Sequence, residues 1–360
     1  MWRRWCATLP FMGVLMACTV RGAENAADLT LVYPCKPATA PITIDGKLDS
    51  AEWGNAVEVS GFTVSGSNTL APEQTLMRLS YDRENLYIAV TCLESNMKGL
   101  KTTNCTERDG QFWLDDSVEF FLNPSHDHES YWQFAATATG MGYDNSQGDS
   151  AWNSNWKVAA TRGPDSWTME AAVPFAEPWK TPAPGALWGF NLCRERQAGG
   201  KTNLYNWADV QRVFNTVTRY GHIAFVAADW QPMEATVAAA VREAGGKESR
   251  LFAQNGWWRA PKEGKPEYCP YIALLRGEDK GFVPLFTELK AIYEAKPQMP
   301  LRDDFQQLDA SYLAVKAVID AGAQLDAQTW TRNKTFLDGL QAKLDKIYWS
   351  VKLVILNETM

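Results

Sequence analysis

The clearest structural pattern in the chain lies in Phe112-Trp113-Leu114-Asp115-Asp116-Ser117-Val118-Glu119-Phe120-Phe121-Leu122-Asn123-Pro124. Val118, Phe120 and Leu122 alternate with polar or solvent-side positions, as in a strand with one face in a core. Pro124 ends the strand because proline cannot donate to a sheet ladder. Glu119 falls on the face opposite the core, with an indole and two aspartates just upstream. This arrangement indicates either a solvated surface strand or a binding site.

Alternating segments of similar length recur on both sides of this strand, separated by turns. They cover residues 75–81, 86–92, 131–137, 156–161, 167–173, 188–194 and 220–225. The first two are joined by the four-residue turn 82–85, which predicts a β-hairpin. Short strands with turn signals throughout predict a mainly β fold, an antiparallel β-sandwich of jelly-roll type, over residues 30–228.

The character of the sequence changes after this region. Residues 229–280 are expected to be a connector with one helix at 234–244. Two later sets of apolar residues step by three and four, as in packed helices: Phe305, Leu308, Tyr312, Val315 and Ile319, then Leu337, Leu340, Leu344, Ile347, Val351 and Val354. They predict an α-helical hairpin over residues 281–360, or a small bundle if 284–295 adds a third helix. The helices could bind a protein partner or only pack on each other.

The N-terminus has the features of an export signal. Arg3 and Arg4 precede a mostly apolar, uncharged run over 5–20, and cleavage is expected after Gly22. Residues 1–22 are therefore predicted to be a signal peptide, which implies a periplasmic or extracellular protein. The segment 15–18 also resembles a lipoprotein box in which Cys18 would be acylated, although simple secretion is favoured. No other segment approaches the length of a membrane span.

Composition narrows the range of functions. The net charge of −7 argues against nucleic-acid binding, which needs a basic surface. Sixteen tryptophans and twelve tyrosines could form sugar-stacking platforms or simply fill a core; Trp257-Trp258 could be such a surface or an inter-domain contact. Five cysteines follow the signal, and in an oxidising compartment Cys92 and Cys105 could form a disulfide.

The predicted sandwich resembles the family 9 carbohydrate-binding modules and the related DOMON-type sandwiches. The resemblance spans residues 40–226 and is carried by five segments in order: Ile44-Asp45-Gly46-Lys47-Leu48-Asp49 with Glu52-Trp53, Leu86-Tyr87-Ile88-Ala89-Val90, Asp116-Ser117-Val118-Glu119-Phe120-Phe121-Leu122, Trp188-Gly189-Phe190-Asn191, and Tyr220-Gly221-His222-Ile223. It implies a jelly-roll sandwich that holds an oligo- or polysaccharide end between two indoles. Trp113 takes the place of the first indole, and Glu119 that of a hydroxyl-binding carboxylate.

Other positions depart from the family pattern. The second indole is replaced by Phe214, with Trp207 as an alternative platform. An arginine expected two residues after Gln133 is Ala135, and a glutamine expected two residues after Asn191 is Cys193. The resemblance makes Gln133 and Asn191 hydrogen-bonding residues, and Arg194, with its neighbours Glu195 and Arg196, could compensate for the losses. It also implies structural Ca²⁺, for which Asp45, Asp49 and Glu52 supply hard oxygen ligands.

Rival functions have weaker support. A glycosidase needs two opposed carboxylates, whereas Asp115, Asp116 and Glu119 share one strand and its lead-in, and 229–360 contain no recognisable catalytic domain. His126-Asp127-His128 could hold a metal but is better explained as a solvated turn. A haem-binding relative would need axial ligands such as Met77 and Met141, and a purely structural scaffold is a further alternative. The sequence therefore predicts an exported, non-catalytic carbohydrate-binding protein.

Overall fold

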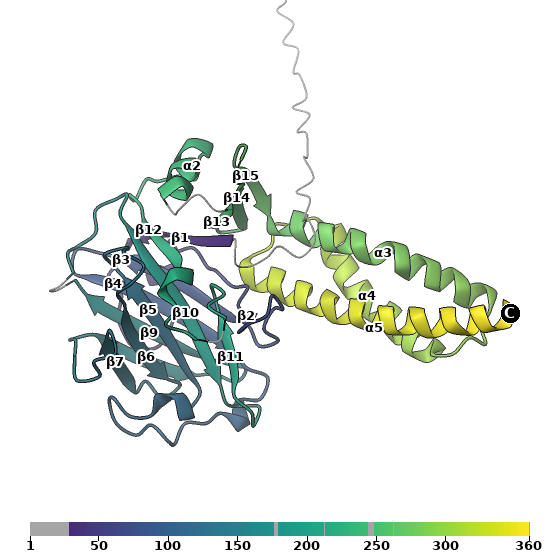
Figure 1. Ribbon diagram of the computed structural model, residues 1–360, viewed down its shortest axis with the longest axis horizontal. Helices are drawn as coiled ribbons and strands as arrows, with labels where there is room; N and C mark the ends of the chain where they lie inside the picture. The colour runs from purple at the N-terminus through teal and green to yellow at the C-terminus, as the bar shows by residue number, and fades with distance from the viewer. Residues whose placement is uncertain (1–28, 176–178, 212, 244–247, 262, 360) are drawn as a thin grey trace, which may run out of the picture.

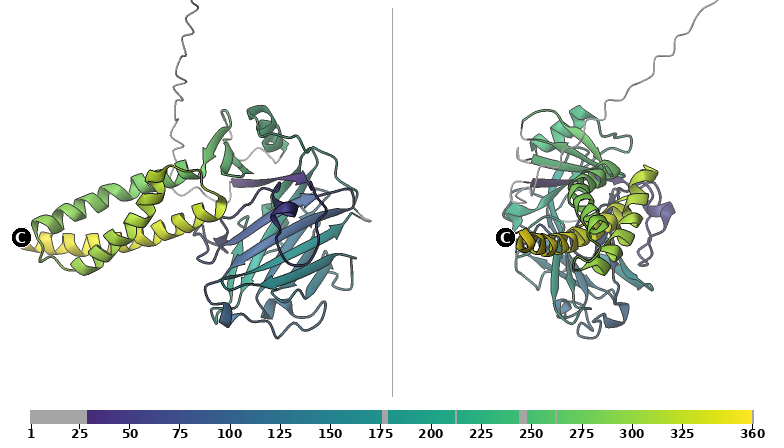
Figure 2. Two further views of the ribbon diagram at one scale, coloured as in Figure 1. Left: turned by 180° about the vertical axis from the view of Figure 1, so that it is seen from behind. Right: turned by 90° about the vertical axis from the view of Figure 1, so that its right-hand side faces the viewer.

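The computed structural model describes residues 29–175, 179–211, 213–243, 248–261 and 263–359 (Figure 1). Two β-sheets pack face to face, and a helical arm extends from one side of them (Figures 1 and 2). The predicted signal peptide, residues 1–22, and the predicted acylation position Cys18 lie outside the described residues. The predicted mainly β sandwich followed by C-terminal helices is confirmed.

The first sheet has the strand order β7-β6-β5-β10-β12-β1 and the second the order β1-β3-β4-β9-β8, so that β1 belongs to both. The strands of the first sheet are β7 (Gly142–Ser146), β6 (Trp132–Thr137), β5 (Ser117–Asn123), β10 (Leu187–Arg196), β12 (Gly221–Phe225) and β1 (Leu29–Pro37). Those of the second are β3 (Thr75–Tyr81), β4 (Asn85–Leu93), β9 (Ser166–Pro174) and β8 (Lys157–Arg162). The short β11 (Asn203–Asn206) pairs with β10 and with β2 (Thr63–Val64). The ladders are antiparallel except those of β1, which pairs in parallel with β12 and β3.

The core between the sheets follows the alternation of β5. Val118, Phe120 and Leu122 are fully buried in it. Phe120 stacks on Phe134 of β6 with ring centroids 5.1 Å apart. Glu119 therefore lies on the outer face of the first sheet, as the sequence predicts.

The outer face of the second sheet is covered by the segment that carries the first part of the family resemblance. Glu170 of β9 accepts hydrogen bonds from the backbone N–H groups of Asp45 (3.1 Å) and Gly46 (2.9 Å) and from the Trp53 indole (2.7 Å). Gly46 has φ +81°, and a Cβ there would lie 2.7 Å from the carbonyl carbon of Ala160. Only glycine fits this turn, which holds α1 (Ser50–Trp53) against the sheet.

Three strands lie within residues 248–261 and 263–270, where the sequence analysis expected a connector. After α2 (Glu234–Glu243), β13 (Glu248–Ala253) pairs in parallel with β1, and β14 (Gly256–Ala260) and β15 (Glu267–Pro270) follow as an antiparallel extension. β13 has no clean apolar alternation, and its pairing with β1 joins segments far apart in the sequence. Local patterns therefore could not reveal it.

Three helices form the arm: α3 (Tyr271–Ala295), α4 (Arg302–Ala321) and α5 (Ala327–Thr359). Their contacts include Phe282 on Tyr312, with ring centroids 4.7 Å apart. α4 ends at Gly322, whose φ of +66° is the left-handed conformation expected for a helix C-cap. Tyr271 stacks on Trp330 at 4.9 Å where the arm meets the sandwich. Within the described ranges, no helix combines the length and apolarity that a membrane span requires.

Candidate functional site

Trp113 is an exposed indole at the rim of the outer face of the first sheet. It lies in the short 3₁₀ helix η3 (Phe112–Leu114), and 45% of its surface is exposed. Phe112 beneath it is buried and contacts it edge-on, with ring centroids 5.3 Å apart. Phe112 in turn packs on Tyr143 of β7 at 4.8 Å. The buried ring of Phe112 and the partly buried ring of Tyr143 thus support the exposed indole.

The two aspartates that follow Trp113 fix its loop in place. Asp115 is buried and accepts hydrogen bonds from the backbone N–H groups of residues 103–105. Asp116, also buried, accepts from the backbone N–H of Gln197 (3.0 Å), whose Nε2 donates to the carbonyl of Trp113 (2.8 Å). Both carboxylates therefore hold the loop that carries the Trp113 indole, and this structural role explains their burial.

Glu119 lies in the middle of the outer face and is only 5% exposed. Its Oε2 accepts a hydrogen bond of 2.5 Å from Nε2 of Gln133 on β6. Its carboxyl group also hydrogen-bonds that of Glu195 on β10. Burial raises the pKa of Glu119 to about 7, and burial together with the charge of Glu119 raises the pKa of Glu195 to about 9. The two groups therefore share a proton near neutral pH.

The neighbours of Glu119 across the sheet explain this pairing. Ala135 and Cys193 lie directly opposite it on β6 and β10, and both are fully buried. The family resemblance places an arginine and a glutamine at these two positions. Because two apolar side chains stand there, Glu119 has no cation beside it in the described structure, and it pairs with Gln133 and Glu195.

Two apolar clusters flank the carboxyl pair, one on each side. The indole-side cluster consists of Cys105, Phe112, Ala135, Met141 and Tyr143, with Trp113 at its edge. The phenyl-side cluster consists of Phe121, Cys193, Val210, Val217 and Tyr220, with Tyr131 and Phe214 packed against it. Phe214 is half-buried on the segment between β11 and β12, which folds over this face. Trp113, Glu119, Gln133 and Phe214 are thus brought to one face, as predicted.

Asn191 lies on the same face but is fully buried and already bonded. Its Oδ1 accepts from the backbone N–H groups of Leu192 (3.0 Å) and Ala208 (2.9 Å), and its Nδ2 donates to the carbonyl of Ala208 (3.2 Å). It holds the segment after β11 against the sheet. The prediction that Asn191 contacts a sugar hydroxyl is therefore wrong.

Arg194 and Trp207 point into the sandwich and correct two further predictions. Arg194 is fully buried and pairs with Glu94 at 3.1 Å, because its place on β10 alternates toward the core. Trp207 is 2% exposed and packs between Phe190 (5.7 Å) and Phe252 (5.8 Å). Neither residue offers an accessible group to a ligand on the outer face.

Tyr143 is a site residue that the sequence analysis did not name, and Glu195 was named there only as a neighbour of Arg194 that could compensate for lost contacts. The signal for Glu195 was available, since Asn191 and Cys193 on the outer face require residue 195 to be there too. Tyr143 belongs to β7, a strand that the alternation patterns did not predict.

The side chains proposed for calcium have local roles. Asp45 accepts from the backbone N–H of Lys47 (2.9 Å), Asp49 caps α1 through the N–H of Ala51 (2.7 Å), and Glu52 accepts from the N–H of Thr43 (3.2 Å). Within the described residues, no group of three or more His, Cys, Asp or Glu side chains has an arrangement that could hold a metal ion. Calcium binding stays a prediction without support from this geometry.

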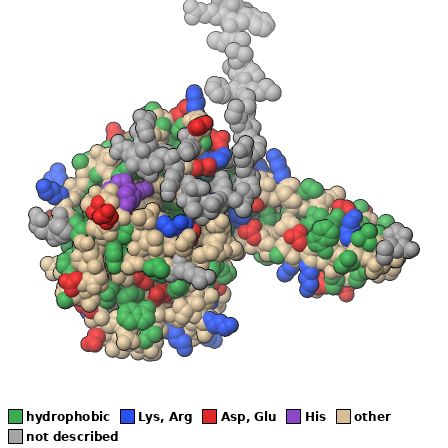
Figure 3. All heavy atoms as spheres, in the orientation of Figure 1, with side chains coloured by type: hydrophobic (Ala, Val, Ile, Leu, Met, Phe, Trp, Pro, Cys, Tyr) green, Lys and Arg blue, Asp and Glu red, His purple; other side chains and the backbone are tan. Residues whose placement is uncertain are grey.

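The three histidines gather at one end of the outer face, where their side chains form a single patch (Figure 3). His126 Nε2 lies 3.0 Å from His222 Nδ1, and the ring centroids of His126 and His128 are 4.6 Å apart. Asp127, which lies between His126 and His128 in the sequence, accepts five local hydrogen bonds that close a tight turn, two of them from the backbone N–H and the hydroxyl of Ser130. This agrees with the solvated-turn interpretation.

The positions of the methionines and cysteines bear on the haem and disulfide predictions. Met77 lies in the main core and Met141 in the indole-side cluster, so they do not face one common pocket. Cys92 and Cys105 are both free thiols, so the expected bridge between them is wrong.

Comparison with known proteins identifies the family of the β-sandwich region. The model of the carbohydrate family 9 binding domain-like family matches residues 44–228, half of the chain. Endo-1,4-beta-xylanase A of Thermoanaerobacterium saccharolyticum is 29% identical over 191 residues, which cover 51% of this chain and 15% of the xylanase. Endo-1,4-beta-xylanase A of Thermotoga neapolitana is 23% identical over 190 residues, 51% of this chain and 17% of the xylanase.

The chain therefore spans about a sixth of the length of these relatives. Among solved structures, a family 9 carbohydrate-binding module of Caldicellulosiruptor kristjanssonii in complex with cellotriose is similar, with 16% sequence identity and a TM-score of 0.43. The match covers 56% of this chain and 98% of that one. By the match of its residues 44–228, the chain belongs to the carbohydrate family 9 binding domain-like family.

Proposed function

We propose that the chain is a non-catalytic carbohydrate-binding protein whose site is the outer face around Trp113 and Glu119. A pyranose ring stacks on the exposed indole, and Phe214 supplies a smaller second platform. Glu119 and Gln133 accept and donate hydrogen bonds to the sugar hydroxyls. The Glu119–Glu195 pair supports this role because it holds a proton donor and acceptors next to each other.

One observation carries the proposal: Trp113 is 45% exposed although its surroundings hold it firmly. An indole of this size left in water by a well-packed loop forgoes the free energy of burial, which points to a binding surface. The buried carboxyl–amide pair of Glu119 and Gln133 nearby supplies the polar groups that orient a polar ligand.

The relatives suggest a substrate class for this site. Because those proteins are xylanases, and the similar solved structure holds cellotriose, we assign a β-1,4-linked polysaccharide as the ligand. The chain would act in capture or breakdown of such material after export, with residues 1–22 as its signal peptide and acylation at Cys18 as the alternative. The helical arm would then be free to contact a protein partner.

A glycan-array screen of the full chain without its signal, followed by calorimetry on the best ligand, tests the proposal. Trp113→Ala should lower affinity by about 30-fold, since a central aromatic contact is worth about 2 kcal/mol. Trp349→Ala is the matched control, because Trp349 is 63% exposed on α5, far from the site. Equal affinity of the Trp113→Ala variant and the control, or no glycan bound at all, would overturn the assignment.

A further inference from the structure

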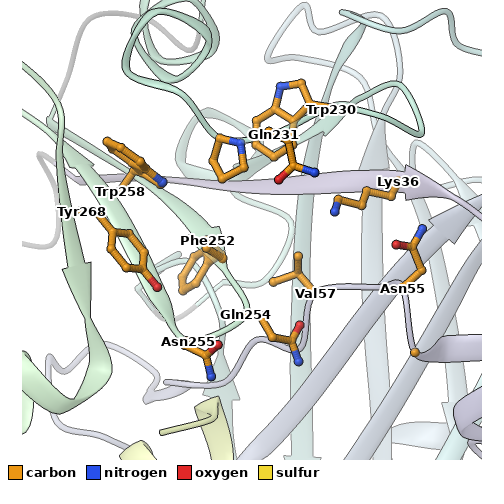
Figure 4. A pocket seen from close by; sticks show the side chains of 13 residues that line it. Lys36, Asn55, Val57, Trp230, Gln231, Phe252, Gln254, Asn255, Trp258 and Tyr268 are labelled. Atoms are coloured by element: carbon orange, nitrogen blue, oxygen red, sulfur yellow. The ribbon is translucent and has the colours of Figure 1, made fainter. Parts of the chain in front are cut away.

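A pocket lies where the β13–β15 extension meets the sandwich, and none of its lining residues belongs to the proposed site around Trp113. Its volume is about 450 Å³, within the usual range of about 300–1,000 Å³ for ligand sites. Lys36 of β1 and the segment after α1 line one side, and β14 and β15 line the other (Figure 4). Most of its lining residues lie beyond residues 44–228, outside the part of the chain that matches the family model.

Partly exposed aromatic rings line this pocket. Trp258 of β14 and Tyr268 of β15 are cross-strand partners, with ring centroids 5.6 Å apart and planes tilted by 45°. Tyr268 is 41% exposed. Figure 4 shows both rings on one side of the pocket and Trp230 at its upper edge. Flat rings with polar edges are the surfaces on which sugar rings stack.

Side-chain amides supply the hydrogen-bonding groups of the pocket. Gln231, Gln254 and Asn255 line it, and Figure 4 places Gln254 and Asn255 along its lower wall. Asn255 is held by the carbonyl of Leu325 at 3.0 Å. The amides of Gln231 and Gln254 have no hydrogen-bond partner in the portion of the chain that the structure describes. An amide carries both donors and an acceptor, which suits hydroxyl groups.

Lys36 gives the pocket a positive charge. It alone is charged among the described residues that line the pocket, and its ammonium group forms no ion pair with any residue of the described ranges. Figure 4 shows it across the pocket from Trp258 and Tyr268. A sugar stacked on those rings would present one edge toward this charge, and a carboxylate at that edge would be favoured.

We propose that this pocket is a second saccharide site, which takes a sugar carrying a carboxylate, that is, a uronic acid. Tyr268 and Trp258 stack the ring, Gln231 and Gln254 bind hydroxyls, and Lys36 binds the carboxylate. The proposal does not depend on binding at Trp113, because the two sites share no residue.

Glucuronate and glucose form a matched pair of probes, since they differ only at C6. Saturation-transfer NMR on the full chain should show saturable binding of glucuronate that is lost in Tyr268→Ala and kept in Trp113→Ala. Lys36→Gln should lower the affinity for glucuronate by about tenfold, because one charge contact is lost, and should leave any affinity for glucose unchanged.

Three outcomes would overturn the proposal: no binding of glucuronate, binding that persists in Tyr268→Ala, or equal affinity for the two sugars in the native chain. Loss of glucuronate binding in Trp113→Ala would show that glucuronate binds at the outer face around Trp113 and not in this pocket. Thermal unfolding of each variant serves as the fold control. Tyr268 is exposed, so its replacement should leave the melting temperature close to that of the native chain.

Discussion

Glu119 and Glu170 are both buried glutamates, on the outer faces of opposite sheets, but their surroundings differ. Glu170 accepts three hydrogen bonds from groups that the fold itself fixes: two backbone N–H groups and the Trp53 indole. Glu119 accepts one from the Gln133 side chain and pairs with a second carboxyl group, that of Glu195.

The difference shows that neither residue type nor burial marks a binding carboxylate. The carboxylate of Glu170 accepts hydrogen bonds from three groups of the segment 45–53, so its role is to hold that segment on the sheet. Glu119 keeps acceptor capacity for an incoming hydroxyl, because a carboxylate offers about four lone-pair positions and only part of them is used. The number of hydrogen-bond donors supplied by the fold thus distinguishes the structural carboxylate, Glu170, from the carboxylate of the proposed binding site, Glu119.

Removing the structural carboxylate should have the largest effect on stability. Glu170→Ala leaves three donors without an acceptor, of which those of Gly46 and the Trp53 indole are buried and that of Asp45 is part-buried, and each buried donor costs about 1–3 kcal/mol. We expect the free energy of unfolding in urea to fall by about 4 kcal/mol, with saccharide affinity unchanged in the protein that remains folded. Glu84→Ala, at an exposed turn between β3 and β4, is the control and should change stability by less than about 0.5 kcal/mol. An equal effect of the two substitutions would contradict the structural role of Glu170.

The carboxyl pair should make stability depend on pH. The pKa values of Glu119 and Glu195 are raised to about 7 and about 9, so the folded protein binds more protons than the unfolded chain. This stabilisation is fully present below about pH 4 and is lost as the pH rises through those values. Between about pH 6 and about pH 7 the free energy of unfolding should fall by on the order of 2 kcal/mol.

Glu195→Gln provides the comparison for that experiment. The substituted amide can donate to Glu119 and carries no charge, so the fall in stability with pH should become shallower. Chemical unfolding across the pH range measures both proteins. An unchanged slope in Glu195→Gln would show that the pair is not the titrating unit.

The smallest of the three effects concerns affinity at Glu119. Glu119→Ala should weaken saccharide binding by about tenfold, the equivalent of one hydrogen bond to a charged or shared-proton group. Glu129→Ala, at an exposed position in the loop between β5 and β6, is the matched control and should leave affinity unchanged. Calorimetry that finds both variants with native affinity would remove Glu119 from the site.

Alternation along single strands predicted much of this account. It placed Glu119 opposite the core, and with the family resemblance it brought Trp113, Gln133 and Phe214 to the same face. The same rule, continued along β10, excludes Arg194 and includes Glu195, so that error could have been avoided. Trp207 follows the short strand β11, whose four residues are too few to show a pattern.

Contacts between distant segments account for what the sequence could not predict. The side-chain amide of Asn191 is occupied by hydrogen bonds to the backbone of Ala208. Ala208 lies in the segment that folds back over the sheet after β11. The pocket near Lys36 exists because β13 pairs with β1, although about two hundred residues of chain separate the two strands. No local periodicity reports such a pairing.

The most direct test of the central claim is an NMR titration of a neutral glycan that follows the tryptophan indole N–H signals, with the Trp113 signal identified by its absence in Trp113→Phe. The account predicts that the Trp113 indole shifts on binding while the indoles of buried residues such as Trp53 and Trp207 stay in place. A glycan that binds without moving the Trp113 signal would contradict it.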